Sequence, residues 1–196
     1  MNLKSNIRVI GGKYRGLSLE MRDSPTTRPT KSILKESLFN VLQGEVCNRV
    51  FIEGFGGSGS VGIEALSRGA REAIFVEYDE QSLQVLRKNL SKLKDEKYQS
   101  ILGDSFATLP RVIENITEEG ILYLDPPFCI RENMQDIYEK CFEMVRQIKN
   151  PKIFLVIFEH LSSYQMPEIL GNFCIMKVKK FGKSTLSYYI KEKEDV

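Results

Sequence analysis

Short apolar runs alternate with amphipathic segments over most of the chain after residue 49. The runs are rich in Val, Ile, Leu and Phe, which is typical of strands that are buried on both faces. The segments between them repeat apolar residues at three- and four-residue spacing, which predicts helices. The expected strands are 50–52, 73–76, 99–102, 121–124 and 153–158, and the expected helices are 58–68, 80–93, 105–115 and 133–148. This alternation predicts a parallel sheet with helices on both faces.

The two ends of the chain have a different pattern. Residues 8–20 contain two short apolar stretches around a glycine-rich turn, which predicts a small hairpin, and a helix is expected from about residue 30 to Gly44. Apolar residues also alternate over 173–180 and 185–190, which predicts an antiparallel hairpin that closes one side of the sheet. We therefore expect an N-terminal extension of residues 1–44 and an α/β domain of residues 45–196.

Composition and charge narrow the class of protein. The chain has 196 residues, of which 42% are hydrophobic and 28% charged, which fits a globular domain and excludes collagen-like and wholly disordered chains. The net charge of +2 is distributed unevenly, with +6 in residues 1–35, −7 in residues 36–175 and +3 in residues 176–196. Basic ends around an acidic middle favour contact with phosphate backbones.

Several classes of site and location are disfavoured by what the chain lacks. The four cysteines (47, 129, 141 and 174) form no C-x-x-C pair and His160 is the single histidine, so we expect neither a metal site nor a disulfide framework. No run approaches the roughly 18 apolar residues of a membrane span. The first residues lack the apolar segment of a signal peptide, and we expect a cytoplasmic protein.

A glycine-rich loop follows the first strand of the predicted sheet. Gly57, Gly59 and Gly62 match G-x-G-x-x-G between a strand and a helix, which allows a ligand close to the backbone. Glu77 ends the second strand, where a carboxylate can accept both hydroxyls of a ribose. The loop alone fits a nicotinamide dinucleotide and S-adenosylmethionine equally.

Two acidic positions favour S-adenosylmethionine. Glu53 lies where the first strand meets the loop, and it would repel a pyrophosphate but suit a cationic methionyl group. Asp104 follows the third strand and could accept a hydrogen bond from the adenine amine, with Phe106 as an apolar cover. These positions lie at the carboxyl ends of adjacent strands, where open α/β sheets bind ligands.

The segment Asp125-Pro126-Pro127-Phe128 follows the fourth strand. An exocyclic amine on a nucleobase is a poor nucleophile, and two acceptors aimed at its N–H bonds would align it and enrich its electron density. The Asp125 carboxylate and the Pro126 carbonyl could serve as these acceptors, because the prolines remove competing N–H groups. Phe128 offers a face on which an extruded base can stack. Catalysis would come mainly from alignment and electrostatics.

These motifs together resemble class I S-adenosylmethionine-dependent methyltransferases that act on exocyclic amines. More narrowly, residues 8–16, 27–30, 56–59 and 63–70 resemble the RsmD-type 16S rRNA guanine-N2 methyltransferases, and the resemblance spans about residues 7–190. It differs where that family has Asp followed by Leu-Phe-Ala-Gly and this chain has Glu53 followed by Gly-Phe-Gly. It also differs at Tyr14, where family members often have Trp.

The resemblance implies an α/β fold with a Rossmann-like seven-stranded mixed sheet, helices on both faces and an N-terminal β-hairpin. It implies S-adenosyl-L-methionine as cofactor and a guanine of 16S rRNA in a small-subunit particle as target, and we expect a monomer. The expected target-base residues are Asp125, Pro126, Pro127 and Phe128. The expected cofactor residues are Arg28, Glu53, Gly54, Phe55, Gly56, Gly57, Gly59, Glu77, Asp104 and Ser105. The expected RNA-binding residues are Arg8, Lys13, Tyr14, Arg15 and Lys183.

Three other functions remain open. A DNA adenine-N6 methyltransferase would use the same chemistry, although the roughly 45 residues before the sheet leave little room for a target-recognition segment. A nicotinamide oxidoreductase would need a proton relay, and His160 has no obvious partner in the sequence. A non-enzymatic RNA-binding module would not require the intact 125–128 segment.

Overall fold

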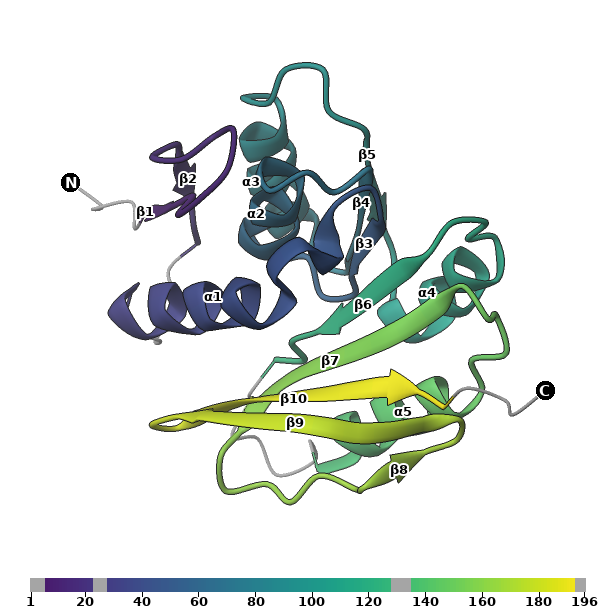
Figure 1. Ribbon diagram of the computed structural model, residues 1–196. Coiled ribbons are helices and arrows are strands. Elements are labelled where there is room, and N and C mark those ends of the chain that lie inside the picture. Colours follow the sequence, from purple (N-terminus) through teal and green to yellow (C-terminus); the bar gives the residue numbers. More distant parts are fainter. Residues whose placement is uncertain (1–5, 23–27, 128–134, 193–196) are drawn as a thin grey trace.

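The computed structural model describes residues 6–22, 28–127 and 135–192 (Figure 1). Its centre is one mixed sheet with the strand order β5-β4-β3-β6-β7-β10-β9-β8. The five parallel strands are β3 (Val50–Glu53), β4 (Glu72–Glu77), β5 (Tyr98–Leu102), β6 (Gly120–Leu124) and β7 (Ile153–Leu161). The antiparallel strands are β8 (Ile169–Leu170), β9 (Phe173–Phe181) and β10 (Ser184–Lys191).

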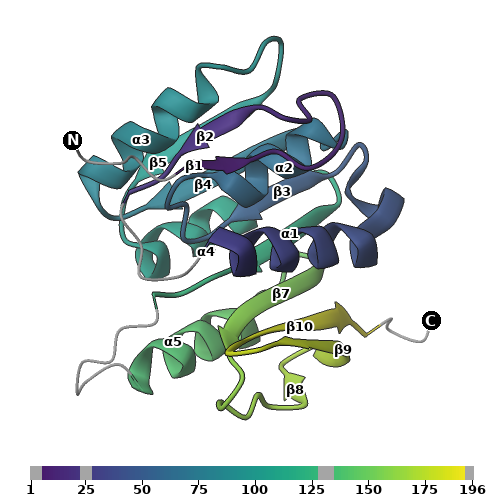
Figure 2. The same ribbon diagram turned by 90° about the vertical axis from the view of Figure 1, so that its left-hand side faces the viewer.

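Helices cover both faces of the sheet. On one face lie α1 (Arg28–Leu42), α2 (Ser60–Ser67) and α3 (Glu80–Leu90), with the short 3-10 turn η1 (Gln43–Val46) after α1. On the other face lie α4 (Ser105–Glu114) and α5 (Gln135–Arg146). The result is the three-layer fold that strand–helix alternation predicts, and Figures 1 and 2 show the layers from two sides.

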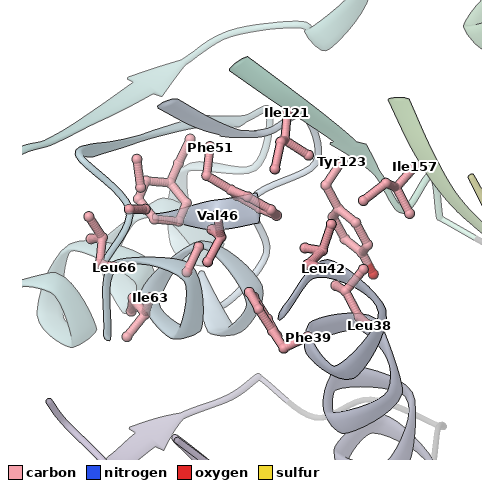
Figure 3. Packing of buried hydrophobic residues seen from close by; sticks show 14 of the residues in the cluster. Leu38, Phe39, Leu42, Val46, Phe51, Ile63, Leu66, Ile121, Tyr123 and Ile157 are labelled. Atoms are coloured by element: carbon pink, nitrogen blue, oxygen red, sulfur yellow. The ribbon is translucent and has the colours of Figure 1, made fainter. Parts of the chain in front are cut away.

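Each central strand contributes alternate residues to two separate cores. In β3, Phe51 packs toward α1 and α2, whereas Val50 and Ile52 pack toward α4 and α5. The first core is drawn in Figure 3, where the Phe51 ring stacks on the Tyr123 ring of β6 at a centroid distance of 6.2 Å. Burial on both faces explains why the parallel strands have continuous apolar sequences.

The N-terminal hairpin is a separate two-stranded sheet of β1 (Asn6–Arg8) and β2 (Ser18–Glu20). It packs near α2 and α3 rather than joining the central sheet (Figure 2). Ile7 and Leu19 are buried in the same core as the residues of α1. The division at residue 44 stays a prediction, and the contacts show that the two parts share one core.

The mixed sheet with helices on both faces and a small N-terminal hairpin is confirmed, and three details differ. The first helix begins at Arg28 rather than near residue 30, because Pro29 falls in its first turn, where no intrahelical N–H bond is lost. The helix expected over 80–93 ends at Leu90. The seven predicted strands are joined by the edge strand β8, whose two residues are too few for a periodic signal. In the described residues, no helix has the length and apolarity to span a bilayer.

Candidate functional site

The carboxyl ends of the parallel strands bring four acidic side chains to one edge of the sheet. Glu53 ends β3, Glu77 ends β4, Asp125 follows β6 and Glu159 lies late in β7. The β6–β7 register pairs Leu124 with Phe158, so Asp125 and Glu159 are the next residues on two neighbouring strands. This edge is where an open α/β sheet binds its ligand.

The glycine loop makes a tight turn between β3 and α2. The Gly59 N–H donates to the Gly56 carbonyl at 2.7 Å, and the Gly56 N–H donates to the Val76 carbonyl of β4 at 2.8 Å. Gly59 has a φ of 73°, and a Cβ at that position would lie 2.2 Å from Leu86 Cδ1. Both the backbone conformation and the packing therefore require glycine at residue 59.

Gly57 combines a positive φ with open surroundings. Its φ is 50°, and a Cβ built there would meet nothing within 4 Å. Its N–H donates to Glu77 Oε2 at 2.6 Å, while Glu77 Oε1 accepts from the Asp79 N–H at 2.8 Å. The structure therefore brings Glu77 and the loop together, as the sequence predicts for a ribose-binding acid beside a glycine turn.

Glu53 lies beneath the loop and is 4% exposed. Its Oε2 accepts from the Gly62 N–H in the first turn of α2 at 2.7 Å. Burial raises the pKa of Glu53 to about 8, although this backbone donor opposes the shift. A cation bound next to this carboxylate would favour its charged form.

Asp104 directly precedes α4 and Ser105 is its first residue, and the two side chains differ in exposure to solvent. Asp104 caps the helix, with Oδ1 accepting from the Phe106 N–H at 3.3 Å, and the residue is exposed. Ser105 is buried, and its hydroxyl donates to the Gly54 carbonyl at 2.6 Å. Ser105 thus positions the start of the glycine loop, and its predicted contact with a cofactor stays a prediction.

An aromatic pair borders the loop. Phe55 follows Gly54, and its ring meets the Phe106 ring of α4 edge to face at a centroid distance of 6.0 Å. Phe106 is the residue that the sequence predicts as an apolar cover for an adenine, and the structure places it next to the loop.

A cavity links the loop to the end of β6. Its walls come from α1, the glycine loop and the ends of β3, β6 and β7. The lining residues are Lys31, Leu34, Lys35, Leu38, Glu53, Phe55, Gly56, Gly57, Ser58, Ser60, Val61, Tyr123, Asp125 and Glu159. Of the predicted site residues, Glu53, Phe55, Gly56, Gly57 and Asp125 line this cavity. Gly54, Gly59, Glu77, Asp104 and Ser105 are not among its lining residues.

Asp125 and Glu159 both line the cavity, and the charge of one affects the pKa of the other. Burial and the negative charge of Glu159 raise the pKa of Asp125 well above its usual value, and Lys31 opposes this shift. The Tyr123 hydroxyl donates to Glu159 Oε2 at 2.6 Å. Pro126 is buried and Pro127 is exposed. Phe128 lies outside the described residues, as does the side chain of Arg28, the first residue of α1.

Sequence reasoning did not single out Glu159, Tyr123 or Lys31 as site residues. Glu159 could have been found, because it is an acidic residue at the end of a strongly apolar strand. Tyr123 lies within an apolar run and has the pattern of a core residue. Lys31 belongs to no motif that would indicate a site. The neighbouring His160 is buried, with Nε2 2.8 Å from Ser187 Oγ and Nδ1 2.9 Å from the Leu161 carbonyl, so its contacts are structural.

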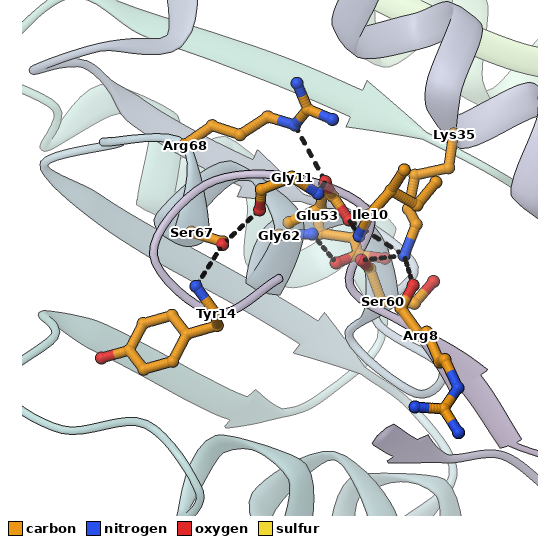
Figure 4. Close-up of polar contacts among 11 residues, drawn as sticks. Arg8, Ile10, Gly11, Tyr14, Lys35, Glu53, Ser60, Gly62, Ser67 and Arg68 are labelled. Carbon is orange, nitrogen blue, oxygen red and sulfur yellow. Dashed lines mark hydrogen bonds and ion pairs between the residues drawn. The ribbon is translucent and has the colours of Figure 1, made fainter. Parts of the chain in front are cut away.

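Glu64 of α2 binds the predicted RNA-binding hairpin to the α/β body. Figure 4 shows the hairpin residues Ile10 and Gly11 near the side chains of Lys35 and Arg68. The Glu64 carboxylate accepts from the N–H groups of Ile10 and Gly11 at 2.8 Å each. It also pairs with Lys35 Nζ at 3.2 Å and with Arg68 Nε at 2.8 Å. Burial lowers the pKa of Lys35, and the charge of Glu64 opposes this shift.

The basic residues of the hairpin differ in their contacts. Lys13 Nζ lies 2.8 Å from Glu96 Oε1, and the Tyr14 hydroxyl donates to the Lys94 carbonyl at 2.6 Å, so both side chains also hold the hairpin in place. Arg15 is exposed, and Arg8 is exposed with one bond to the Gly16 carbonyl of its own turn. Arg8 and Arg15 are therefore exposed hairpin cations, and Lys13 is exposed as well but is paired with Glu96.

Lys183 is exposed in the turn between β9 and β10. In both ribbon views α1 lies between that turn and the N-terminal hairpin (Figures 1 and 2).

A second polar contact joins β2 to the glycine loop. The Asn89 side-chain amide of α3 donates to the carbonyls of Glu20 and Ser58, at 2.9 Å each.

The described residues contain no group of three or more His, Cys, Asp or Glu side chains arranged to hold a metal ion. Cys47, Cys141 and Cys174 are free thiols. The fourth cysteine, Cys129, lies outside the described residues.

Comparison with known proteins connects this geometry to a family. A family model described as Conserved hypothetical protein 95 matches residues 7–190. The chain is 38% identical over 128 residues to the Haemophilus influenzae protein named Ribosomal RNA small subunit methyltransferase D, a match that covers 65% of this chain and 66% of that protein. The match thus spans slightly less than two thirds of that relative.

Two further proteins are similar over nearly their whole length. The Bacillus subtilis protein called "Putative rRNA methyltransferase YlbH" is 28% identical over 186 residues, covering 94% of this chain and 99% of that protein. The solved structure of "Putative methyltransferase yhhF from Escherichia coli" superposes with a TM-score of 0.77 at 27% identity, covering 96% of this chain and 99% of that one.

Proposed function

Because the chain belongs to the family described as Conserved hypothetical protein 95, whose named relatives include a ribosomal RNA small subunit methyltransferase, we propose that it methylates 16S rRNA. The methyl donor is S-adenosyl-L-methionine, and the acceptor is the exocyclic N2 amine of a guanine. The single observation that supports this most strongly is the shared cavity, in which the glycine loop and Asp125 face the same space.

The glycine loop and the residues around it offer the hydrogen-bond acceptors and the open space that a nucleoside cofactor needs. Gly57 leaves open space where any other residue would have a side chain, and Glu77 holds a carboxylate beside it for two ribose hydroxyls. Glu53 offers a buried carboxylate to a cationic methionyl group. Asp104 and Phe106 would contact the adenine. When bound, S-adenosylmethionine supplies an electrophilic methyl group.

The opposite side of the cavity would hold the target base. The Asp125 carboxylate and the Pro126 carbonyl accept the two N–H bonds of the amine, which aligns its lone pair with the methyl group and increases its electron density. Attack of the neutral amine forms the N–CH3 bond as the S–CH3 bond breaks and leaves a positively charged methylated ammonium group, which is strongly acidic and releases a proton after transfer. Burial and the charge of Glu159 raise the pKa of Asp125, so that carboxylate is a suitable first acceptor for the proton.

The RNA would lie over the basic hairpin. Arg8 and Arg15 face solvent and are free to meet phosphates, and Lys183 supplies charge across α1. Lys13 and Tyr14 would then act mainly by shaping the hairpin through their bonds to residues 94–96. We propose that the enzyme acts in the cytoplasm as a monomer on a small-subunit particle.

One labelling experiment tests the proposal. The protein is incubated with isotopically labelled S-adenosylmethionine and, separately, with small ribosomal subunits that lack the modification, naked small-subunit rRNA and duplex DNA. Nucleoside mass spectrometry then identifies the product. Label in N2-methylguanosine from rRNA or subunits, with none from DNA, is the expected result. Label in N6-methyladenine from DNA would keep the chemistry of Asp125 but overturn the substrate.

A further inference from the structure

Glu159 is a buried carboxylate that the proposed methyl transfer leaves without a direct role. It is 7% exposed and lines the same cavity as Asp125. Burying a carboxylate is unfavourable unless partners compensate for the lost water. The described residues supply one hydrogen-bond donor to it, the Tyr123 hydroxyl.

Tyr123 fixes the orientation of this carboxylate. Its hydroxyl binds Glu159 Oε2 at 2.6 Å, and its ring is held by stacking on Phe51. No hydrogen bond from a described residue reaches Glu159 Oε1, and that atom is not among the buried polar atoms without a partner. Oε1 is therefore open to the cavity and can accept a hydrogen bond from a ligand there.

Lys31 contributes the positive charge at this end of the cavity. It lies in the early part of α1, is partly buried, and lines the cavity with Asp125 and Glu159. Burial raises the pKa of both Asp125 and Glu159, and the positive charge of Lys31 opposes this shift in each. Apart from Glu53 beneath the loop and Lys35, which pairs with Glu64, the charged side chains that line the cavity are Asp125, Glu159 and Lys31.

This set matches the Watson–Crick edge of guanine, which carries an O6 acceptor, an N1–H donor and the N2 amine in a row. An adenine has a lone pair at N1 and an amine at position 6. A carboxylate opposite N1 therefore accepts a hydrogen bond from guanine and faces the lone pair of adenine. Enzymes that act on extruded bases distinguish them by such contacts.

We propose that Glu159, oriented by Tyr123, selects guanine by accepting its N1–H, while Lys31 donates to O6 and Asp125 holds the N2 amine. This inference rests on the proposed guanine-N2 activity and adds to it the residues that decide which base is accepted. It assigns the buried Glu159–Tyr123 pair a role in specificity that is separate from methyl transfer.

The test uses a base that keeps the reacting amine and changes only its neighbours. The guanosine identified by the labelling experiment is replaced by 2-aminopurine ribonucleoside in a small-subunit rRNA fragment or reconstituted subunit. This base has the N2 amine but lacks both N1–H and O6. The ratio of kcat/KM for guanine to kcat/KM for 2-aminopurine is measured for the wild type and for Glu159→Gln. Intrinsic differences in amine reactivity cancel when these two ratios are compared.

We expect Glu159→Gln to lower that ratio by about ten- to a hundredfold, because the glutamine amide can donate to the N1 lone pair. Tyr123→Phe is expected to lower it less, and the exposed Glu36→Gln serves as a charge-matched control with an unchanged ratio. Thermal unfolding and S-adenosylmethionine binding verify that each variant is folded. If Glu159→Gln does not fold, Lys31→Met tests the O6 contact in the same assay.

Two results overturn the inference, and they are distinguishable. If the folded variants lose activity equally on both bases, the ratio stays at the wild-type value and Glu159 has only a structural role. If the wild type produces no N2-methylguanosine from any rRNA substrate, the proposed function fails and the specificity assignment fails with it.

Discussion

Lys35 Nζ lies 3.2 Å from Glu64 Oε2, and the two side chains are 2% and 0% exposed. The pair joins α1 to α2 at the point where the hairpin backbone also binds Glu64. Removing one partner from such a site leaves an uncompensated buried charge, which is costly. Glu64 therefore connects three segments that are far apart in the sequence.

The first prediction concerns the stability that depends on Glu64. We expect Glu64→Ala to lower the free energy of unfolding by about 3–5 kcal/mol, because Lys35 and two backbone N–H groups lose their acceptor. Urea denaturation followed by circular dichroism measures the change. The exposed Glu36→Ala is the control and should stay within about 0.5 kcal/mol of the wild type. A loss below about 1 kcal/mol for Glu64→Ala would contradict the prediction.

Asp125 should be required for turnover but not for cofactor binding. We expect Asp125→Asn to reduce kcat by about a hundredfold or more, because the amide is a weaker acceptor for the target amine. Its affinity for S-adenosylmethionine should stay within about threefold of the wild type. Single-turnover kinetics and isothermal titration calorimetry provide the two values. An equal loss of cofactor binding in the folded variant would remove Asp125 from the base side of the cavity.

The exposed cations of the hairpin should contribute to RNA affinity through phosphate contacts. We expect Arg8→Ala combined with Arg15→Ala to weaken binding and to reduce the slope of log K against log salt by about 1.5, through lost counterion release. Filter binding of small-subunit rRNA over a salt series measures the slope. Lys140→Ala, an exposed cation on the opposite helical layer, is the matched control. An unchanged slope in the double variant would exclude the hairpin from the RNA-binding face.

The buried Glu53 should make the fold less stable as pH rises. Burial raises the pKa of Glu53 to about 8 from its usual 4.5, so the folded protein favours the protonated carboxyl. Its contribution is fully present below about pH 4.5 and is lost as pH rises through 8, with a limiting slope of about 1.4 kcal/mol per pH unit. Unfolding of the wild type and of Glu53→Gln is compared from pH 5 to 9. The difference between them should change with pH in this range, and a constant difference would contradict the assignment.

Alanine substitutions at Gly59 and Gly182 should separate the effect of packing on stability from the effect of backbone conformation. Both have a positive φ, 73° and 60°, but a Cβ at Gly59 meets Leu86 at 2.2 Å and a Cβ at Gly182 meets nothing. We expect Gly182→Ala to cost about 1–2 kcal/mol of stability from conformation alone. Gly59→Ala should cost more and should also weaken S-adenosylmethionine binding. Equal costs with unchanged cofactor affinity would show that the loop adapts without consequence.

Much of the fold could be predicted from local sequence signals. The parallel strands have apolar runs that end at glycine or acidic residues, and each run became a strand within a few residues of its expected bounds. The glycine loop and Glu77 were predicted to meet, and they do so through the Gly57 N–H. These features depend on residues that are close in sequence or on the rule that parallel strand ends share an edge.

The contacts between distant segments could not be predicted in the same way. Nothing in the sequence around Glu159 indicates that its partner is Tyr123, because a tyrosine inside an apolar run looks like any other core residue. The charge of Lys13 and the aromatic ring of Tyr14 predict contact with RNA, which stays a prediction, but do not indicate that both residues also bind the body of the protein. Their bonds to residues 94–96 depend on how the hairpin docks, which is a tertiary property.

The docking of the hairpin also sets an order for folding during synthesis. The two-stranded hairpin is made before the elements on which it docks, because Ile10 bonds to a residue 54 positions later and Lys13 to one 83 positions later. An isolated hairpin of this size is marginally stable in water. The N-terminal segment must therefore leave the ribosome without its docking surface and wait until α2, α3 and residue 96 have emerged. In the order of synthesis, the hairpin therefore precedes every element that it docks on.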